Sequence, residues 1–394
     1  MTTEPRPPKQ ANDYPAATQS TIAYFLTNII LGLTTAALGP ALPNLSEQTG
    51  AQLGAIGLLF TAQNFGYMSG SLGFGNLLDR APGNRLLTII LLTMSAMLGL
   101  IPLTASLALL MLIFFVLGMA NGGLDVCGNP MLVWIYRDRA NPVLNALHFF
   151  FGIGAFLAPL LVAQSLTMGW GIRGAFWLLA LYPLPVALWL FRLPSPSSPK
   201  VDELVEHQPT PWLLVILIAV VYAFYVGAEL GFGGWIYTFA INQGLAGTTG
   251  AAYLNSLFWG ALTVGRLISV GIATRVRPAI MLMVDFIGCL ASLGLIWSAP
   301  GSVTVVWIGT ILLGLFMASV FPTLLAFAGR HMTLSGATSR WFFVGTGLGG
   351  MTLPWVLGEL IERHGPEAMI PALFLTIALV LLIFSGTTIV AAKK

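Results

Sequence analysis

Asp125 is an acidic residue in the middle of a long apolar segment, where an ionised side chain costs at least about 2.5–3.5 kcal/mol to insert into a membrane. Asn121 and Asn129 stand four residues before and after it, so the three side chains share one helical face. A carboxylate between two amides suits the hydroxyl groups of a polyol or a Na⁺ ion, which prefers oxygen ligands. We therefore expect Asp125 to bind a solute or to ligate Na⁺. The alternative is a packing role, in which Asp125 is hydrogen-bonded to an adjacent helix.

Glu229 is the second embedded acid, and aromatic residues accompany it. Tyr222 and Tyr225 precede it by seven and four residues on the same helical face, and Trp235 follows further along. Aromatic rings can cover the C–H faces of a sugar while a carboxylate accepts hydrogen bonds from its hydroxyls. Glu229 is therefore a candidate for solute binding, with Tyr225 and Trp235 beside it. The alternatives are a titrating group and a structural acid.

Four other polar residues are weaker candidates for a binding site. His148 shares a helical face with Asn145, and a neutral imidazole can bind a solute or relay a proton. An interhelical hydrogen bond explains His148 equally well. Gln63, Asn28 and Asn255 are more often packing groups than ligands, and we keep them as secondary candidates.

Arg266 and Asp285 lie in consecutive apolar segments, at similar distances from the loop that carries Arg275 and Arg277. Equal depth on neighbouring helices favours a structural ion pair between Arg266 and Asp285, in which the two charges cancel.

The elements that carry these residues must be membrane helices. Of the 394 residues, 57% are hydrophobic and 8% are charged, whereas a soluble domain has about 25% charged residues. Cys127 and Cys289 lie in apolar segments without metal-ligand spacing, and no basic cluster of the kind that binds nucleic acid is present. The first 19 residues contain four prolines and no apolar core, so we expect no signal peptide. The sequence predicts an all-α membrane protein without a cofactor.

Apolar runs between turn signals predict twelve transmembrane helices. They form two sets of six, separated by a linker over residues 193–211 that is rich in proline, serine and charge. The predicted domains are a disordered tail over 1–19, an N-terminal six-helix bundle over 20–192 and a C-terminal bundle over 212–394. The twelve spans lie near residues 20–42, 54–77, 85–105, 108–135, 142–165, 174–192, 212–241, 252–275, 279–298, 303–329, 338–361 and 368–390.

The distribution of basic residues predicts the orientation of these spans. Cytoplasmic loops collect Lys and Arg. With both termini inside, fourteen of the 17 basic residues fall on the cytoplasmic side, only Arg173 and Arg363 fall outside, and Arg266 lies within a span. We expect a multi-pass protein of the cell membrane, inner or plasma, with both termini in the cytoplasm, which works as a monomer in the lipid bilayer.

An internal repeat relates the two sets of six helices. The segment Phe150–Gly154 has a counterpart in Phe343–Gly347, 193 residues later, and Gly122 and Pro130 match Gly314 and Pro322 at nearly the same offset. An offset equal to half the chain predicts a duplicated six-helix unit, with a solute site near mid-membrane between the halves.

The loop after the second span resembles a family signature. Gly75-Asn76-Leu77-Leu78-Asp79-Arg80, with Gly83 and Arg85, is similar to the G-x-L-x-D-R-x-G-R-K motif of the major facilitator superfamily, although it has one extra residue and Asn84 before Arg85. The resemblance implies two pseudo-symmetric six-helix bundles. Asp79 and Arg80 would act as a gate at the cytoplasmic side, because Asp79 can accept hydrogen bonds from a helix N-terminus or an Arg. A solvated turn that only sets the topology is the alternative.

A finer resemblance covers three spans. Gly122–Pro130, Leu147–Gly152 and Tyr225–Glu229 resemble the fucose permease group and its branch of sodium-dependent glucose transporters. That resemblance implies sugar uptake coupled to Na⁺ or H⁺. The fucose permeases carry an aspartate in the first span, where this chain offers only Asn28, Thr34 and Thr35, which favours Na⁺.

Two transport functions therefore remain open: a symporter of a sugar or similar polar solute, and a proton-driven exporter of amphipathic drugs or metabolites. The four His and two Cys provide no catalytic constellation, and the chain has no nucleotide-binding Gly-rich loop, so neither an enzyme nor an ATP-driven pump is expected.

Overall fold

The computed structural model describes residues 14–78, 80–196, 211–332 and 336–392. These residues form a bundle of long helices without strands in the described ranges. The N-terminal half contains α1 (Ala17–Ala36), α2 (Leu38–Thr49), α3 (Leu53–Ile56), α4 (Leu58–Leu78), α5 (Gly83–Leu100), α6 (Leu107–Tyr136), α7 (Ala140–Thr167), α8 (Gly171–Leu181) and α9 (Pro183–Arg192). The C-terminal half contains α10 (Trp212–Asn242), α11 (Thr248–Ala273), α12 (Pro278–Ser298), α13 (Val303–Met317), α14 (Val320–His331), α15 (Gly336–His364) and α16 (Met369–Ala392).

Four of the predicted spans are each built from two helices. The span near 54–77 is interrupted at Gly57, between α3 and α4, and in the other three the break lies close to a proline. The bend of 48° between α1 and α2 comes just before Pro40. Pro183 begins α9 directly after α8, and Pro322 follows the break between α13 and α14. Proline lacks a backbone N–H and clashes with the preceding turn, so it interrupts the helical hydrogen bonds at these points.

Within the described residues, nine helical segments are long and apolar enough to cross a membrane, and the bent pair of α1 and α2 makes a tenth. The other two predicted spans correspond to α4 and α15, which fall outside that set. Both are rich in glycine and polar residues, and they pack against each other across the two halves. Several of their polar side chains face protein, since Gln63 of α4 is buried and Asn64 Nδ2 donates to the Gly350 carbonyl of α15 at 3.1 Å.

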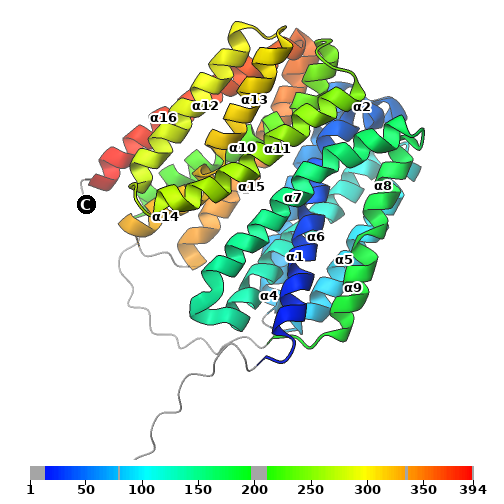
Figure 1. Cartoon of the computed structure of the whole chain (residues 1–394), viewed down its shortest axis with the longest axis vertical. Coiled ribbons are helices and arrows are strands. Elements are labelled where there is room, and N and C mark those ends of the chain that lie inside the picture. The colour runs from blue at the N-terminus through cyan, green and yellow to red at the C-terminus, as the bar shows by residue number, and fades with distance from the viewer. Residues whose placement is uncertain (1–13, 79, 197–210, 333–335, 393–394) are drawn as a thin grey trace, which may run out of the picture.

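The two halves repeat the same helix pairing. In the N-terminal half α1 packs along α7 and α4 along α6, and in the C-terminal half α10 packs along α15 and α11 along α13. Figure 1 shows the two bundles side by side, and the predicted pseudo-symmetric pair of bundles is confirmed. The exact domain boundaries stay a prediction, since residues 1–13 and 197–210 lie outside the described residues. Within the predicted tail, helix α1 already begins at Ala17.

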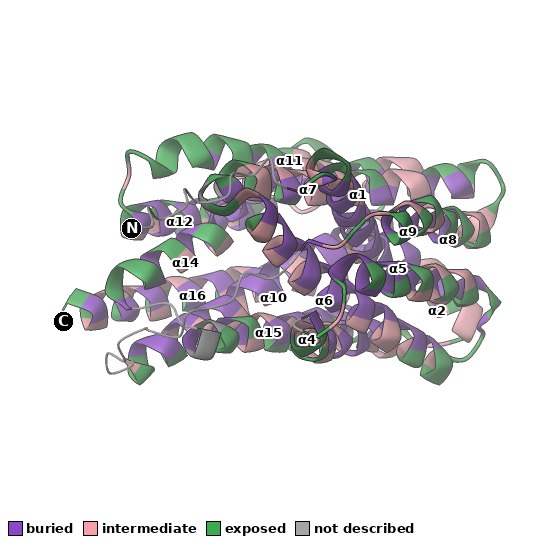
Figure 2. Ribbon diagram, turned by 90° about the horizontal axis from the view of Figure 1, so that it is seen from below, coloured by how far each residue is buried: buried purple, intermediate pink, exposed green. Residues whose placement is uncertain are grey.

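The outer surface of the bundle is apolar. Large hydrophobic side chains such as Leu382, Leu375 and Phe191 are more than 60% exposed. In Figure 2 the buried faces of the helices point towards one another and the exposed faces point outward. A belt of exposed apolar side chains on a helical bundle fits lipid contact, so the chain is a multi-pass membrane protein.

The halves meet mainly at one end of the bundle. We call the end that carries the start of α1 and the end of α16 the terminal face, and the opposite end the far face (Figure 1). Near the far face the backbone N–H of Gly54 donates to Glu362 at 2.6 Å, and Thr61 Oγ1 donates to the Met351 carbonyl at 2.7 Å. These contacts join α3 and α4 to α15 and close the far face between the halves.

Candidate functional site

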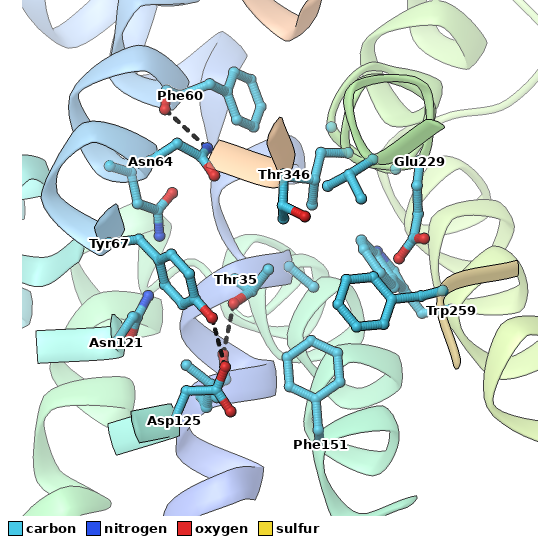
Figure 3. Close-up of a pocket in the computed structure, with 18 of the residues that line it drawn as sticks. Thr35, Phe60, Asn64, Tyr67, Asn121, Asp125, Phe151, Glu229, Trp259 and Thr346 are labelled. Atoms are coloured by element: carbon cyan, nitrogen blue, oxygen red, sulfur yellow. Dashed lines mark hydrogen bonds between the residues drawn. The ribbon is translucent and has the colours of Figure 1, made fainter. Parts of the chain in front are cut away.

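A cavity of about 220 Å³ lies between the two halves. Helices α1, α4, α6 and α7 line one side, and α10, α11, α14 and α15 line the other. Its polar and aromatic lining residues are Asn28, Thr35, Phe60, Gln63, Asn64, Tyr67, Asn121, Asp125, His148, Phe151, Glu229, Trp259, Arg266, Phe321 and Thr346. Both predicted acids therefore line one cavity, from opposite walls (Figure 3).

Asp125 is held by donors from its own half. The Tyr67 hydroxyl donates to Asp125 Oδ2 at 2.5 Å, and Asn129 Nδ2 donates to Oδ1 at 2.9 Å. Asn121, one turn away, accepts a hydrogen bond from Thr34 Oγ1 at 3.0 Å. Each carboxylate oxygen thus receives a donor, and the two hydrogen bonds fix the orientation of the Asp125 side chain on the cavity wall.

Glu229 has its own set of partners on the opposite wall. The Tyr225 hydroxyl lies 2.5 Å from Glu229 Oε2 and 2.6 Å from the carbonyl oxygen of Met317. Arg266 Nη2 lies 3.9 Å from Glu229 Oε1, close enough for an ion pair but not for a hydrogen bond. One wall of the cavity thus carries Glu229 and Arg266, and the opposite wall carries Asp125.

The predicted ion pair between Arg266 and Asp285 is wrong. Asp285 is buried in α12 and accepts a hydrogen bond from Ser319 at the break between α13 and α14. Arg266 instead extends from α11 towards Glu229 of α10. Their similar distance from the loop between the two helices did not identify the partners. The direction in which each helix turns its side chain decided that Arg266 approaches Glu229 and Asp285 approaches Ser319.

A second cavity of about 260 Å³ continues from the first towards the terminal face. His148 and Arg266 line both cavities. Arg330 and Pro278 line the second cavity nearest the terminal face, where α14 ends and α12 begins. The central site therefore opens towards the terminal face, whereas the contacts of Gly54 and Glu362 close it on the other side.

Residues 24–354 match the family model described as Major Facilitator Superfamily. The chain belongs to the major facilitator superfamily. Its members are secondary transporters rather than enzymes, so this protein moves a solute across a membrane without a nucleotide-driven step.

Individual relatives match this transporter over most of its length. Sodium-dependent glucose transporter 1 of Xenopus laevis is 31% identical over 82% of this chain and 72% of its own length. Sodium-dependent glucose transporter 1A of Mus musculus is 28% identical over 86% of this chain and 88% of its own. Among solved structures, a mutant of the nucleoside transporter NupG superposes with a TM-score of 0.75 at 13% identity, covering 94% of this chain and 99% of its own. The last match establishes the fold alone.

Six of the ten predicted binding residues of this transporter line the central cavity: Asn28, Gln63, Asn121, Asp125, His148 and Glu229. The other four lie behind it. Asn129 and Tyr225 support the two acids, whereas Trp235 Nε1 donates to the Pro354 carbonyl at 2.7 Å and Asn255 Nδ2 donates to the Gly233 carbonyl at 2.6 Å.

Tyr67 is the principal cavity residue that the sequence did not single out. Its position four residues after Gln63 places both on one face of α4, and that spacing is the signal that could have found it. Of the predicted gate, Arg80 is exposed beyond the end of α4, and Asp79 lies outside the described residues.

Proposed function

We propose that this transporter takes up a sugar or a similarly small polar solute, driven by a Na⁺ or H⁺ gradient through alternating access. The observation that carries the proposal is the meeting of Asp125 and Glu229 in one cavity between the halves. Carboxyl and amide groups on opposite walls can bind several hydroxyls of one solute, and they exchange partners when the halves rock.

The lining of the cavity supports a sugar over an amphipathic cargo. Asn64 and Asn121 supply amides, and Phe60, Phe151 and Trp259 supply ring faces that can cover C–H groups (Figure 3). An exporter of amphipathic drugs, the alternative function, fits this cavity less well.

The names of the relatives support both the solute and a cation. Two of them are named as sodium-dependent glucose transporters. In this chain Asp125 is the candidate Na⁺ ligand, because its carboxylate lines the cavity beside the carbonyl-bearing amide of Asn121. A carrier of one solute and one cation needs no further partner than the bilayer, and we propose that it works as a monomer.

The excess of basic residues at the terminal face supports a cytoplasmic location for both termini, in the cell membrane. With that orientation the central cavity opens to the cytoplasm and the far face is the closed external gate.

A counterflow assay with purified protein in liposomes tests this function. D-Glucose, deoxyhexoses and amino sugars are offered with an imposed Na⁺ or pH gradient. We expect at least one hexose to exchange and to accumulate with a cation gradient, and we expect D125N and E229Q to abolish the accumulation. Full coupled transport by both variants would contradict the proposal, and uptake indifferent to both ions would contradict symport.

A further inference from the structure

The hydroxyl of Tyr225 has more hydrogen-bond acceptors than protons. Glu229 Oε2 lies 2.5 Å from it and the Met317 carbonyl oxygen lies 2.6 Å from it. Both distances are those of O–H···O hydrogen bonds, and a phenol supplies a single proton. The Met317 carbonyl has no proton to donate, so the second proton must belong to Glu229.

A protonated Glu229 satisfies every group in this chain of contacts. In that state the carboxylic acid would donate to the Tyr225 oxygen across the 2.5 Å contact, which frees the Tyr225 hydroxyl to donate to the Met317 carbonyl. Met317 is the last residue of α13, where the break before α14 leaves carbonyl groups available to side-chain donors. An ionised Glu229 would instead leave one pair of acceptors in close contact with no proton between them. Tyr225 and Met317 are both almost fully buried, so water cannot relieve that contact.

We infer that Glu229 is the proton-carrying residue of this transporter and that it holds its proton in the present conformation. This assignment, which rests on the proposed function, names H⁺ as the coupling ion. It also separates the two acids, because both oxygens of Asp125 accept donors while Glu229 is itself a donor.

Arg266 provides the partner for the other protonation state. Its Nη2 lies 3.9 Å from Glu229 Oε1, on the side of the carboxyl group away from Tyr225. When Glu229 releases its proton to water, the new carboxylate and the Arg266 guanidinium can close into an ion pair, so the charge stays compensated inside the membrane. The two states differ in whether Glu229 faces Tyr225 or Arg266.

The two connected cavities provide a route for the released proton. Arg266 and His148 line both the central cavity and the second cavity, which reaches the terminal face. Among the described residues, the ionisable groups near Glu229 include Tyr225 on its own helix, Arg266 on α11 and the buried thiol of Cys289 on α12. His148 on α7 and Asp125 on α6 face it across the cavity. The cavity-lining residues of α14 and α15 on this wall, Phe321 and Thr346, carry no charge.

The test compares E229Q with wild type in proteoliposomes, with D-glucose as the probe. The Gln amide can donate to Tyr225 as the carboxylic acid does, but it cannot release a proton. We expect E229Q to retain slower counterflow that no longer varies with pH. Accumulation driven by a pH gradient should fall to a ratio of one.

The matched control is D285N, which alters a buried acid that does not line the cavity and should keep pH-driven accumulation. Infrared difference spectroscopy on wild type gives a second readout, because a protonated carboxyl band should be present, persist in D285N and vanish in E229Q.

Three results would overturn the assignment: pH-driven accumulation by E229Q at the wild-type ratio, accumulation driven by Na⁺ but not by H⁺, or a carboxyl band that E229Q leaves in place. Wild-type protein that exchanges no hexose would instead contradict the proposed function itself.

Discussion

At the scale of single residues, the two acids of the cavity differ in the kind of support they receive. Asp125 is surrounded by donors, the Tyr67 hydroxyl and the Asn129 amide. Glu229 contacts the Tyr225 hydroxyl, which also contacts the Met317 carbonyl, and it faces the Arg266 guanidinium beyond hydrogen-bond distance. The two carboxyl groups on opposite walls therefore differ in their hydrogen-bond partners, and we expect them to have different roles.

Tyr67→Phe removes the donor of the 2.5 Å hydrogen bond to Asp125 while keeping the ring. Hydrogen bonds to charged groups contribute about 1.5–3 kcal/mol, so we expect kcat/KM for hexose transport to fall by roughly tenfold or more. The measurement is initial uptake in proteoliposomes. Tyr136→Phe is the control, because Tyr136 contacts Thr21 away from the cavity and should transport normally. Equal activity of the two variants would argue against a role for Tyr67.

Asp285→Asn should leave hexose uptake close to wild type, within about twofold. Its carboxylate faces Ser319 instead of the cavity, and an Asn oxygen can accept the same hydrogen bond. Uptake by D285N as poor as that of E229Q would show that Asp285 takes part in transport, contrary to its position.

At the scale of elements, glycines set the distance between paired helices. Gly118 of α6 lies against the backbone of Gln63 in α4, where an added Cβ would come within 1.9 Å of the Gln63 carbonyl oxygen. In membrane proteins such small residues let backbones approach closely, and here the close approach brings Tyr67 of α4 to Asp125 of α6.

Gly118→Ala should therefore separate α4 from α6 and lower stability by about 1–3 kcal/mol, the usual cost of overpacking. Thermal unfolding in detergent measures the loss, and we expect transport to decrease with it because Tyr67 moves away from Asp125. Gly73→Ala is the matched control in α4, since nothing lies within 4 Å of an added Cβ there. A melting temperature of G118A equal to that of G73A would contradict this account of the packing.

At the scale of the whole molecule, the halves are joined at the far face and separated by cavities towards the terminal face. The carboxylate of Glu362 on α15 accepts a hydrogen bond from the backbone N–H of Gly54 on α3, which is one of the contacts that close the far face between the halves. Alternating access requires this hydrogen bond to break when the far face opens.

Glu362→Ala should favour opening of the far face. Spin labels at Glu47 and His364, two exposed positions near this face, report the distance between the halves by double electron–electron resonance. We expect E362A to broaden the distribution towards longer distances. Glu367→Gln, a change to another exposed acid of the same face, should leave the distribution unchanged. An identical distribution for E362A would mean that Glu362 does not hold the gate.

The sequence by itself determined that the chain lies in a membrane, that it is helical, and that Asp125 and Glu229 lie within its spans. Apolar runs of membrane-spanning length, the excess of basic residues in alternate loops and the half-length repeat depend on local composition, which a reader can count along the chain. The same local rule placed Asp125, Asn121 and Asn129 on one helical face, and the hydrogen bond of Asn129 to Asp125 follows from that spacing.

Only the tertiary structure decided which side chains meet. The direction in which a helix turns each residue depends on its rotation against its neighbours, and helix packing sets that rotation over distances that no local pattern encodes. Arg266 therefore faces Glu229 rather than Asp285, and Tyr67 reaches Asp125 because Gly118 lets two backbones touch. The break after Met317, which gives Tyr225 its second acceptor, likewise brings together residues 92 positions apart.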